Sequence, residues 1–383
     1  MAPEIALAAL EGLREPGNVL DPMSGSGTVV RQASFEGHRA LAFDVDPLAV
    51  LVSRVSSRKV DIDRLESLYD DLIVDASELS SKEVKLPWID SDEETESFIR
   101  YWFGPKQRSV LRKLAYIIHQ MDCAATSRDR RHIDVLKVAL SRIIITKEAG
   151  ASLARDVSHS RPHKVVEVSD YDVLGGFQTS FMQVLGFLEG GMPKSDGVVK
   201  SGDARRLRQI ASESIDLVVT SPPYLNAIDY LRGHKLSLVW FGYSLKAIRN
   251  IRGESIGAER APSKVPSEAT NQIRLAMLKE GRLPGRFDQI ASRYAADLHL
   301  IVGQIKRVLK AEGKAVLVVG DSCVQSVFIS NSDGVKQSAL LHGLQLESSI
   351  RRELPRTSRY LPVSGDSLSK RMRFENILTF TKA

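Results

Sequence analysis

The sequence contains few cysteines: Cys123 and Cys323 are the only two among its 383 residues. Two thiols cannot form a disulfide framework or a four-cysteine zinc site, and both fit a reducing compartment. We therefore expect neither structural disulfides nor a bound metal.

Long apolar runs are missing as well. No stretch reaches the ~18 uninterrupted apolar residues of a membrane helix, and the opening Met1–Leu13 lacks the basic start and the small-residue cleavage site of a signal peptide. A composition of 43% hydrophobic and 26% charged residues excludes disorder throughout and is typical of a soluble globular protein. These features predict a cytoplasmic protein without a membrane segment.

The net charge of +6 is distributed unevenly along the chain. Between Asp61 and Glu96, thirteen acidic residues stand against three basic ones, which predicts a solvated connector. Arg100–Lys164 holds fourteen basic and five acidic residues, and Lys246–Lys310 holds thirteen and six. Two basic segments fit a groove that follows a phosphate backbone, and they equally fit the solvated faces of amphipathic helices.

Short apolar runs that stop at Gly, Asp, Ser or Pro predict β-strands. They are Asn18–Leu20, Arg39–Phe43, Gly197–Val199, Ile215–Thr220, Lys314–Val319 and Asn376–Thr381. Helical patterns, such as those of 29–36 and 295–309, stand between several of them. This alternation predicts an α/β fold with a doubly wound, mainly parallel sheet and helices on both faces.

The chain divides by texture into a core and two other segments. Within residues 51–195, the stretches Phe98–Met121 and Ile133–Glu148 show apolar side chains at helical spacing with basic residues on the other face, so we expect a mostly helical insertion. Residues 246–294 are rich in Gly, Pro, Ser and Arg, and we expect them to be irregular. The core is then assembled from 1–50, 196–245 and 295–383.

A Gly-rich turn joins the first predicted strand to a helix. At Gly25 and Gly27 the missing Cβ lets a ligand approach the backbone and the amides at the start of that helix. Val30 stands where a dinucleotide-binding turn has its third glycine, which disfavours a pyrophosphate ligand. Asp44, at the end of the next strand, either accepts hydrogen bonds from two ribose hydroxyls or caps a helix.

S-adenosylmethionine fits these requirements because it has a ribose and no phosphate. Its carboxylate and ammonium group need a tight turn, and its adenine needs an apolar slot with a polar edge. We expect Val45 and Asp203 to supply that slot and edge.

A second motif ends the strand Ile215–Thr220. Ser221 is followed by Pro222 and Pro223, which lack N–H donors and fix φ, and then by Tyr224. The carboxyl edge of such a sheet is where ligands bind. The Ser221 hydroxyl and the Pro222 carbonyl can accept hydrogen bonds from an exocyclic amine while Tyr224 stacks on its ring; the alternative is an ordinary turn.

These motifs resemble those of the amino-methylating DNA methyltransferases. Residues 21–28, Asp-Pro-Met-Ser-Gly-Ser-Gly-Thr, resemble the cofactor-binding motif of that family, residues 220–224 its catalytic motif, and 202–205 its adenine-contacting turn. The resemblance covers roughly 1–50, 196–243 and 295–383. Met23 replaces the usual Phe, and the insertion separates the second and third cofactor strands, where the family's target domains are not usually described.

The resemblance implies a class I methyltransferase fold with a seven-stranded sheet, S-adenosylmethionine as cofactor and double-stranded DNA as partner. It assigns catalysis to Ser221, Pro222, Pro223 and Tyr224. It assigns cofactor binding to Asp21, Pro22, Met23, Gly25, Gly27, Thr28, Asp44, Val45 and Asp203. A cognate restriction endonuclease and a bacterial or archaeal nucleoid location follow as further expectations.

The expected product is N4-methylcytosine within a specific DNA sequence, formed on a base flipped out of the duplex. Ser before Pro-Pro-Tyr is associated in this family more with cytosine-N4 than with adenine-N6 enzymes. Carbon-5 methylation needs a Cys nucleophile after a Pro, which neither Cys123 nor Cys323 provides. Adenine-N6 methylation, amino-methylation of RNA and a non-catalytic DNA-binding module remain alternatives.

Polar residues beyond the catalytic motif are candidates for nucleic-acid contacts. Those that follow it directly, and that could line the pocket of the extruded base, are Asp229, Tyr230, Arg232 and His234. Candidates for phosphate or base-edge contacts, or else for simple solvated charges, are Arg249, Arg252, Arg260, Arg282 and Arg286. The helical insertion 51–195 and the basic segment 246–294, which holds all five of these arginines, are our candidates for the DNA-binding surface.

Overall fold

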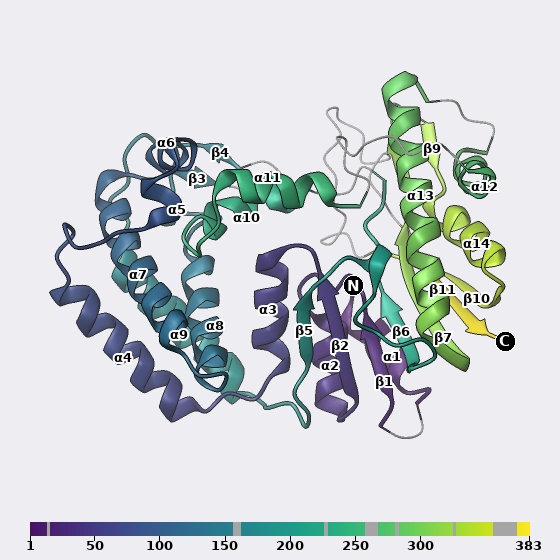
Figure 1. Ribbon diagram of the computed structural model, residues 1–383, viewed down its shortest axis with the longest axis horizontal. Coiled ribbons are helices and arrows are strands. Elements are labelled where there is room, and N and C mark those ends of the chain that lie inside the picture. The colour runs from purple at the N-terminus through teal and green to yellow at the C-terminus, as the bar shows by residue number, and fades with distance from the viewer. Residues whose placement is uncertain are drawn as a thin grey trace. The chain divides into compact units, whose positions relative to one another are not determined.

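The computed structural model describes residues 1–13, 16–155, 162–225, 229–256, 267–279, 283–324, 327–354 and 374–383. They fall into two compact units. The sheet unit comprises Met1–Val45, Ser195–Ala227 and Gly253–Ala383, and the helical unit comprises Asp46–Lys194 and Ile228–Arg252. Each unit therefore gathers segments that are far apart in the sequence (Figure 1).

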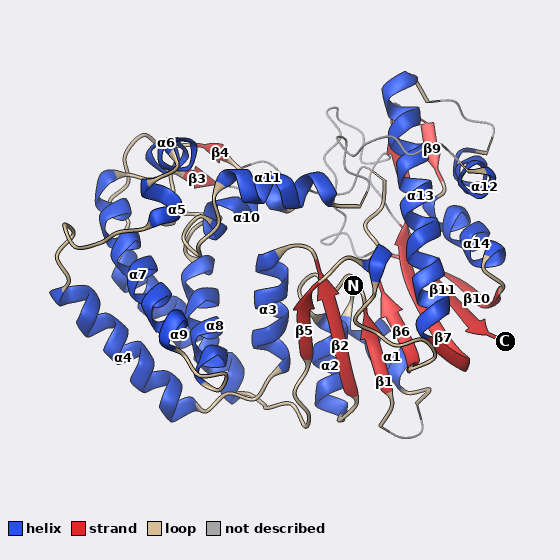
Figure 2. Ribbon diagram, in the orientation of Figure 1, coloured by secondary structure: helices blue, strands red, loops and turns tan. Residues whose placement is uncertain are grey.

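The sheet unit is built on a seven-stranded sheet with the order β10-β11-β7-β6-β1-β2-β5 (Figure 2). Its strands are β1 (Asn18–Asp21), β2 (Arg39–Asp44), β5 (Val198–Ser201), β6 (Ile215–Thr220), β7 (Leu309–Gly320), β10 (Leu344–Glu353) and β11 (Phe374–Lys382). From β5 to β7 neighbouring strands pair in parallel, and β11 pairs antiparallel with both β7 and β10. The prediction of a seven-stranded, mainly parallel sheet in an α/β fold is confirmed.

Helices cover both faces of this sheet. They are α1 (Pro3–Leu10), α2 (Thr28–Glu36), α12 (Glu268–Leu278), α13 (Gly285–Val308) and α14 (Asn331–Leu341). Alternate side chains of β7 face opposite ways: Ala315, Leu317 and Val319 share a core with α13, and Val316 and Val318 are buried on the other side. On that other side, α1 and α2 pack beside β1, β2 and β6.

Smaller elements complete the sheet unit. A short 3₁₀ helix η1 (Ala204–Arg206) follows β5, and β8 (Ser322–Val324) and β9 (Val327–Ile329) form a two-stranded ribbon after β7. The strand β10 was not predicted from the sequence. Seven of its ten residues are exposed, so it lacks the alternation that marks a half-buried strand.

The helical unit contains most of the predicted insertion and also residues 228–252. Its helices are α3 (Pro47–Ser57), α4 (Ile62–Glu78), α5 (Pro87–Asp90), α6 (Glu93–Trp102), α7 (Pro105–Ala124), α8 (Asp129–Arg142), α9 (Val173–Glu189), α10 (Leu231–Leu238) and α11 (Leu245–Glu254). The strands β3 (Ala154–Arg155) and β4 (His163–Lys164) form a small ribbon. One hydrophobic core joins these helices and buries the side chains of Phe103 and Trp240, whose rings meet edge to face at 5.0 Å.

The solvated connector expected between Asp61 and Glu96 is wrong, because most of this segment is helical. Asp61 caps α4 by accepting a hydrogen bond from the backbone N–H of Arg64. Leu65 and Leu72 are fully buried on one face of α4, and the acidic residues of this helix lie on its remaining surface. Counting charges without their spacing concealed this amphipathic helix.

The irregular structure expected for 246–294 is also wrong in the residues that the structure describes, since α11, α12 and the start of α13 lie there. Ser267 caps α12, and Ile273 and Met277 anchor that helix in the core. Arg260 and Arg282, two of the candidate contacts, lie outside the described residues. Among the described helices, none has the length and apolar character needed to cross a membrane.

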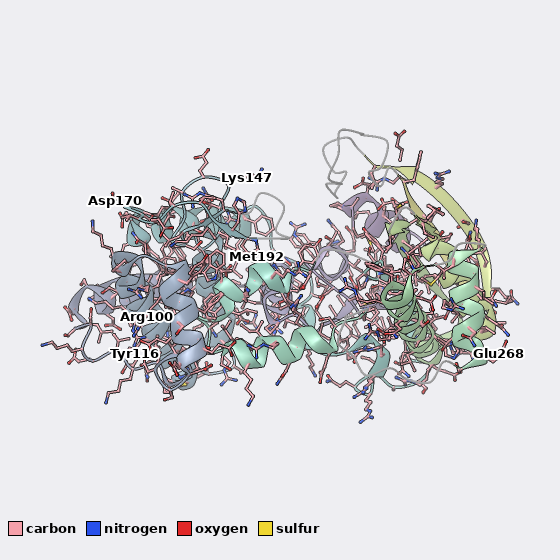
Figure 3. The ribbon with its side chains drawn as sticks, turned by 90° about the horizontal axis from the view of Figure 1, so that it is seen from above. Arg100, Tyr116, Lys147, Asp170, Met192 and Glu268 are labelled. Carbon is pink, nitrogen blue, oxygen red and sulfur yellow. The ribbon has the colours of Figure 1, made fainter. Side chains whose placement is uncertain are left out.

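Side chains of both units are drawn in Figure 3, where Arg100 and Lys147 belong to the first basic segment. Both are exposed, Arg100 beside Glu96 at 2.5 Å. Other basic residues of that segment are half-buried beside acids, as Lys137 is at 2.7 Å from Asp122. Solvated helix faces therefore account for part of this charge.

Candidate cofactor and catalytic site

The Gly-rich turn adopts the backbone that its glycines predict. Gly25 has φ +52° and Gly27 has φ +84°, in the left-handed region where a side chain is strained. Gly27 is the N-cap of α2, and its N–H donates to the Ser24 carbonyl at 2.9 Å. Thr28 begins the helix, so the turn directs the free amides of α2 toward the carboxyl end of β1.

Asp44 holds this turn in place. Its Oδ2 accepts a hydrogen bond from the Gly25 N–H at 2.8 Å, and its carbonyl accepts one from the Gly202 N–H at 3.0 Å. The helix-cap alternative for Asp44 is excluded for α3, whose N-cap is Asp46. Asp44 thus connects the ends of β1, β2 and β5.

The turn after β5 is tightly packed. A Cβ at Gly202 would lie 2.6 Å from Cδ1 of the buried Phe43 ring, so the site requires glycine. The next residue, Asp203, accepts hydrogen bonds from the backbone N–H and the guanidinium of Arg205. Arg205 also pairs with Asp297 of α13 at 2.9 Å. Arg205 therefore fixes the orientation of the predicted adenine contact, a role that the sequence did not indicate.

Asp21 links the cofactor turn to the catalytic strand. Its side chain is buried, and its Oδ1 accepts hydrogen bonds from the Thr220 hydroxyl at 2.7 Å and the Met23 N–H at 3.1 Å. Burial raises the pKa of the Asp21 carboxyl to about 7, and the negative charge of Asp44 adds to that rise. Pro22, also buried, continues the link into the turn.

The Ser221 hydroxyl has a defined direction. It lies just after β6 and donates its hydrogen bond to the Val318 carbonyl of β7 at 3.0 Å. A hydroxyl has one proton, so Ser221 Oγ can offer a further polar partner only its lone pairs. In this arrangement the Ser221 hydroxyl can accept a hydrogen bond from a further partner, and its catalytic role stays a prediction. Ser221 and Tyr224 are half-buried and Pro222 is buried.

A chain of buried hydrogen bonds fixes the end of the catalytic turn. The Ser322 hydroxyl donates to the Leu225 carbonyl at 2.7 Å, and Asn331 Nδ2 donates to that same hydroxyl at 2.7 Å. Asn331 is fully buried at the start of α14 and also donates to the Gly320 carbonyl at 2.9 Å. These hydrogen bonds have no signature in the sequence, because Leu225 and Ser322 are 97 residues apart.

The strand ends bring the predicted residues to one edge of the sheet. Because β1, β2, β5 and β6 are parallel, the residues that follow them share the carboxyl edge. The strand order reverses direction between β1 and β6, the switch point at which open α/β sheets bind ligands. Val45 directly follows Asp44 there, and Pro223 follows the Ser221 corner.

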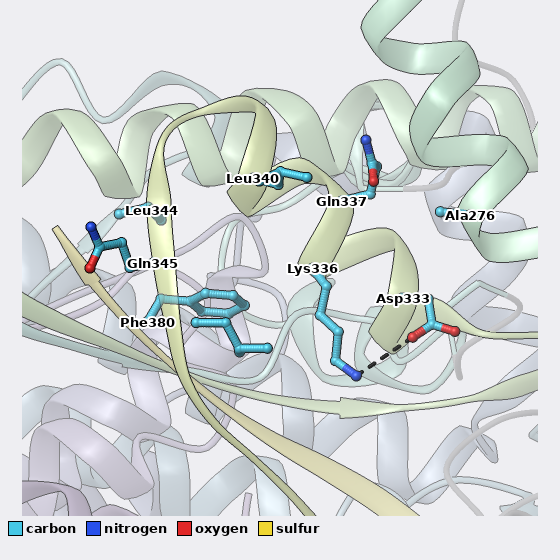
Figure 4. Close-up of a pocket in the computed structure, with 9 residues that line it drawn as sticks. Ala276, Asp333, Lys336, Gln337, Leu340, Leu344, Gln345 and Phe380 are labelled. Carbon is cyan, nitrogen blue, oxygen red and sulfur yellow. Dashed lines mark ion pairs between the residues drawn. The ribbon is translucent and has the colours of Figure 1, made fainter. Parts of the chain in front are cut away.

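A separate cavity of about 500 Å³ lies between α12, α14, β10 and β11 (Figure 4). Leu340, Leu344 and Phe380 line it, and an ion pair between Lys336 and Asp333 spans 3.6 Å at its side. None of the predicted site residues borders this cavity. The candidate site is therefore defined by strand ends and turns.

Comparison with known proteins gives one relative in sequence. The chain is 23% identical over 262 residues to Type II methyltransferase M.BsoBI of Geobacillus stearothermophilus. The match covers 63% of this chain and 50% of that protein, so the chain spans about half the length of this relative. The resemblance found in the motifs is confirmed as a weak homology, and cytosine-N4 and adenine-N6 types are not distinguished by it. No family model matches the chain.

Two solved structures show limited similarity. A methylase of Thermus thermophilus, provisionally assigned to DNA modification and complexed with S-adenosyl-L-methionine, has 17% identity, a TM-score of 0.26, and coverage of 47% of this chain and 51% of its own. A SAM-dependent methyltransferase of Methanosarcina mazei has 9% identity, a TM-score of 0.34, and coverage of 100% and 98%. Likeness at this level establishes neither activity nor substrate.

Proposed function

We propose that the protein is an S-adenosylmethionine-dependent DNA methyltransferase that modifies the N4 amine of cytosine within a specific sequence. The observation that carries this proposal is the Ser221 hydroxyl, held as an acceptor at the switch point beside the Gly25 turn. The weak homology to a type II methyltransferase supports it. Adenine-N6 is the second candidate because the same corner accepts either amine.

The residues of the turns fit the proposed cofactor. The amides at the start of α2 suit the methionine carboxylate, Asp44 suits the ribose hydroxyls, and Val45 with Asp203 suits the adenine. Met23 is half-buried against the core of the sheet unit and offers an apolar floor. S-adenosylmethionine supplies an electrophilic methyl group when bound.

The catalytic corner acts by positioning and polarisation. The amine donates its hydrogens to Ser221 Oγ and to the Pro222 carbonyl, which draws the nitrogen lone pair out of conjugation with the ring and aligns it for attack. Tyr224 stacks on the base after the base has left the duplex. The hydrogen bond from Ser221 to Val318 contributes by keeping the hydroxyl proton away from the amine.

The remaining partners follow from this activity as further proposals. Double-stranded DNA is the substrate, the segments 51–195 and 246–294 contribute to its binding, and the protein acts at the nucleoid of a bacterial or archaeal cell. A restriction endonuclease of the same specificity is its functional partner.

Nucleoside mass spectrometry of the product tests the proposal. Purified protein is incubated with S-adenosylmethionine and either genomic DNA or RNA, with the Ser221→Ala protein as matched control. We expect N4-methylcytosine in DNA. N6-methyladenine would keep the mechanism and overturn the choice of base, and methylated RNA with unmodified DNA would overturn the DNA assignment.

A further inference from the structure

Three basic side chains of the helical unit gather around one carboxylate. Arg232 Nε of α10 donates to Asp229 Oδ2 at 3.1 Å, and Arg252 Nε of α11 donates to the same oxygen. Lys235 lies one turn after Arg232 on α10, and its charge interacts with both arginines and with Asp229. Three cations and one anion leave an excess of two positive charges.

The contacts with Asp229 use only one N–H of each arginine. A guanidinium has five N–H donors, four of them on its two terminal nitrogens. Within the described part of the chain, those terminal nitrogens of Arg232 and Arg252 donate to no protein acceptor. Their side chains are 39% and 45% exposed, so a ligand can reach them.

Lys235 has no hydrogen-bond acceptor among the described residues, and its ammonium lies 5.2 Å from the centre of the Phe98 ring. Burial lowers the pKa of Lys235, and the positive charge of Arg252 lowers it further. A half-buried ammonium beside two guanidinium groups is costly unless an anion approaches.

We propose that Arg232, Lys235 and Arg252 bind a phosphodiester group of the DNA backbone. The terminal nitrogens of an arginine match two phosphate oxygens, and lysine supplies a point charge. This assignment rests on the proposed function, because DNA, the substrate proposed there, is the source of the phosphodiester group.

The neighbouring residues favour a nucleotide over a free phosphate. Tyr230 precedes Arg232 by two residues, is 52% exposed, and stacks on His234 with ring centres 6.0 Å apart. An exposed aromatic ring beside a basic cluster is the arrangement with which proteins bind the bases and backbone of unstacked nucleic acid. In the sequence, Asp229 stands five residues after Tyr224 of the catalytic motif.

A purely structural role makes a different prediction. The two Nε contacts with Asp229 already tie α10 to α11, and Lys235 takes no part in that tie. If the cluster only joined the helices, replacing Lys235 would leave DNA affinity unchanged. If it binds phosphate, removal of one charge must weaken both the affinity and its dependence on salt.

Fluorescence anisotropy with a labelled DNA duplex of mixed sequence tests the site, at several salt concentrations. We expect Lys235→Gln to lower affinity by about 3- to 10-fold and to reduce the slope of log K against log[salt] by about 0.9, the value for one phosphate contact. Lys235→Arg keeps the positive charge and should retain most of the wild-type affinity and most of the salt dependence. Lys82→Gln, the same change in the acidic part of the helical unit, is the matched control and should change neither.

The outcomes separate this site from the proposed function. Wild-type DNA binding that is unaffected by Lys235→Gln and by Arg252→Gln, in variants with wild-type thermal unfolding, overturns the phosphate site alone. Displacement of DNA by millimolar inorganic phosphate would instead assign the cluster to free phosphate and overturn the backbone assignment. If RNA is the methylated substrate, the proposed function fails, and the phosphate site stands only if Lys235 controls RNA affinity in the same way.

Discussion

Asp44 and Ser221 in the sheet unit are held by backbone groups, whereas the charged side chains of the α10–α11 cluster are held by one another. Asp44 and Ser221 each bond a main-chain partner fixed by the sheet or its turns. Arg232 and Arg252 share one oxygen of Asp229 and stay partly exposed. A preorganised site suits chemistry, because it needs no rearrangement in the transition state, and an adaptable cluster suits an electrostatic contact with a flexible backbone.

The largest effect that separates the two regions should come from the pH dependence of stability. Asp21 has a pKa raised from 3.8 to about 7 in the folded state, so between these values the folded chain holds a proton that the unfolded chain has lost. This contribution to stability is complete below pH 4 and is lost as the pH rises through 7, which amounts to about 4 kcal/mol.

The variant Asp21→Asn isolates this contribution, since the amide oxygen can still accept from Thr220 and Met23. We expect Asp21→Asn to match the wild type near pH 4 and to exceed its stability by up to about 4 kcal/mol at pH 8. Urea denaturation from pH 4 to pH 8 measures both proteins. Parallel stability curves would show that Asp21 ionises in the folded chain as it does in water.

A smaller effect, confined to catalysis, is expected from Ser221→Ala. The amine loses one of its two acceptors, so turnover should fall by roughly one to three orders of magnitude while S-adenosylmethionine binding is kept. Ser221→Asp should retain part of the activity because a carboxylate also accepts the amine hydrogens. Single-turnover methylation and calorimetric cofactor titration provide the two measurements. Equal losses of binding and turnover would place Ser221 in the cofactor site instead.

The smallest effect is expected at Ser322, which acts through the backbone of Leu225. Ser322→Ala removes the donor to that carbonyl, and turnover should fall by about 10-fold with the KM for DNA little changed, as for the loss of one hydrogen bond. Ser322→Thr keeps the hydroxyl and should recover most of the rate. A drop in thermal stability with unchanged turnover would limit Ser322 to a structural role.

The strands that carry the site could be predicted to within a few residues. Ile215–Thr220 matches β6 because a run of β-branched residues stops at Ser-Pro-Pro, and Arg39–Phe43 matches β2 up to its final Asp44. The polar and exposed β10 gave no such signal. Helix α4 was missed because its acidic residues outnumber the leucines of its buried face.

The side chains of the candidate site could be predicted where they stand next to the glycines and prolines of a motif. The backbone carbonyls that hydrogen-bond to this site could not be predicted. The Val318 carbonyl and the Leu225 carbonyl have no sequence signature, since every residue carries one. The pairing of Asp229 with Arg252 and of Arg205 with Asp297 became visible only when elements distant in the chain were placed together.

The helical unit is assembled from two stretches of chain, Asp46–Lys194 and Ile228–Arg252, and this has a consequence for how it folds. Its core closes around Trp240 from the second stretch, and Trp88 of the first donates to the Val239 carbonyl at 2.9 Å. Contacts across 151 residues make loop closure slow. During synthesis the first stretch must therefore wait, with part of its apolar face uncovered, until the ribosome has passed Arg252, and in this interval that face is exposed to chaperones and to aggregation.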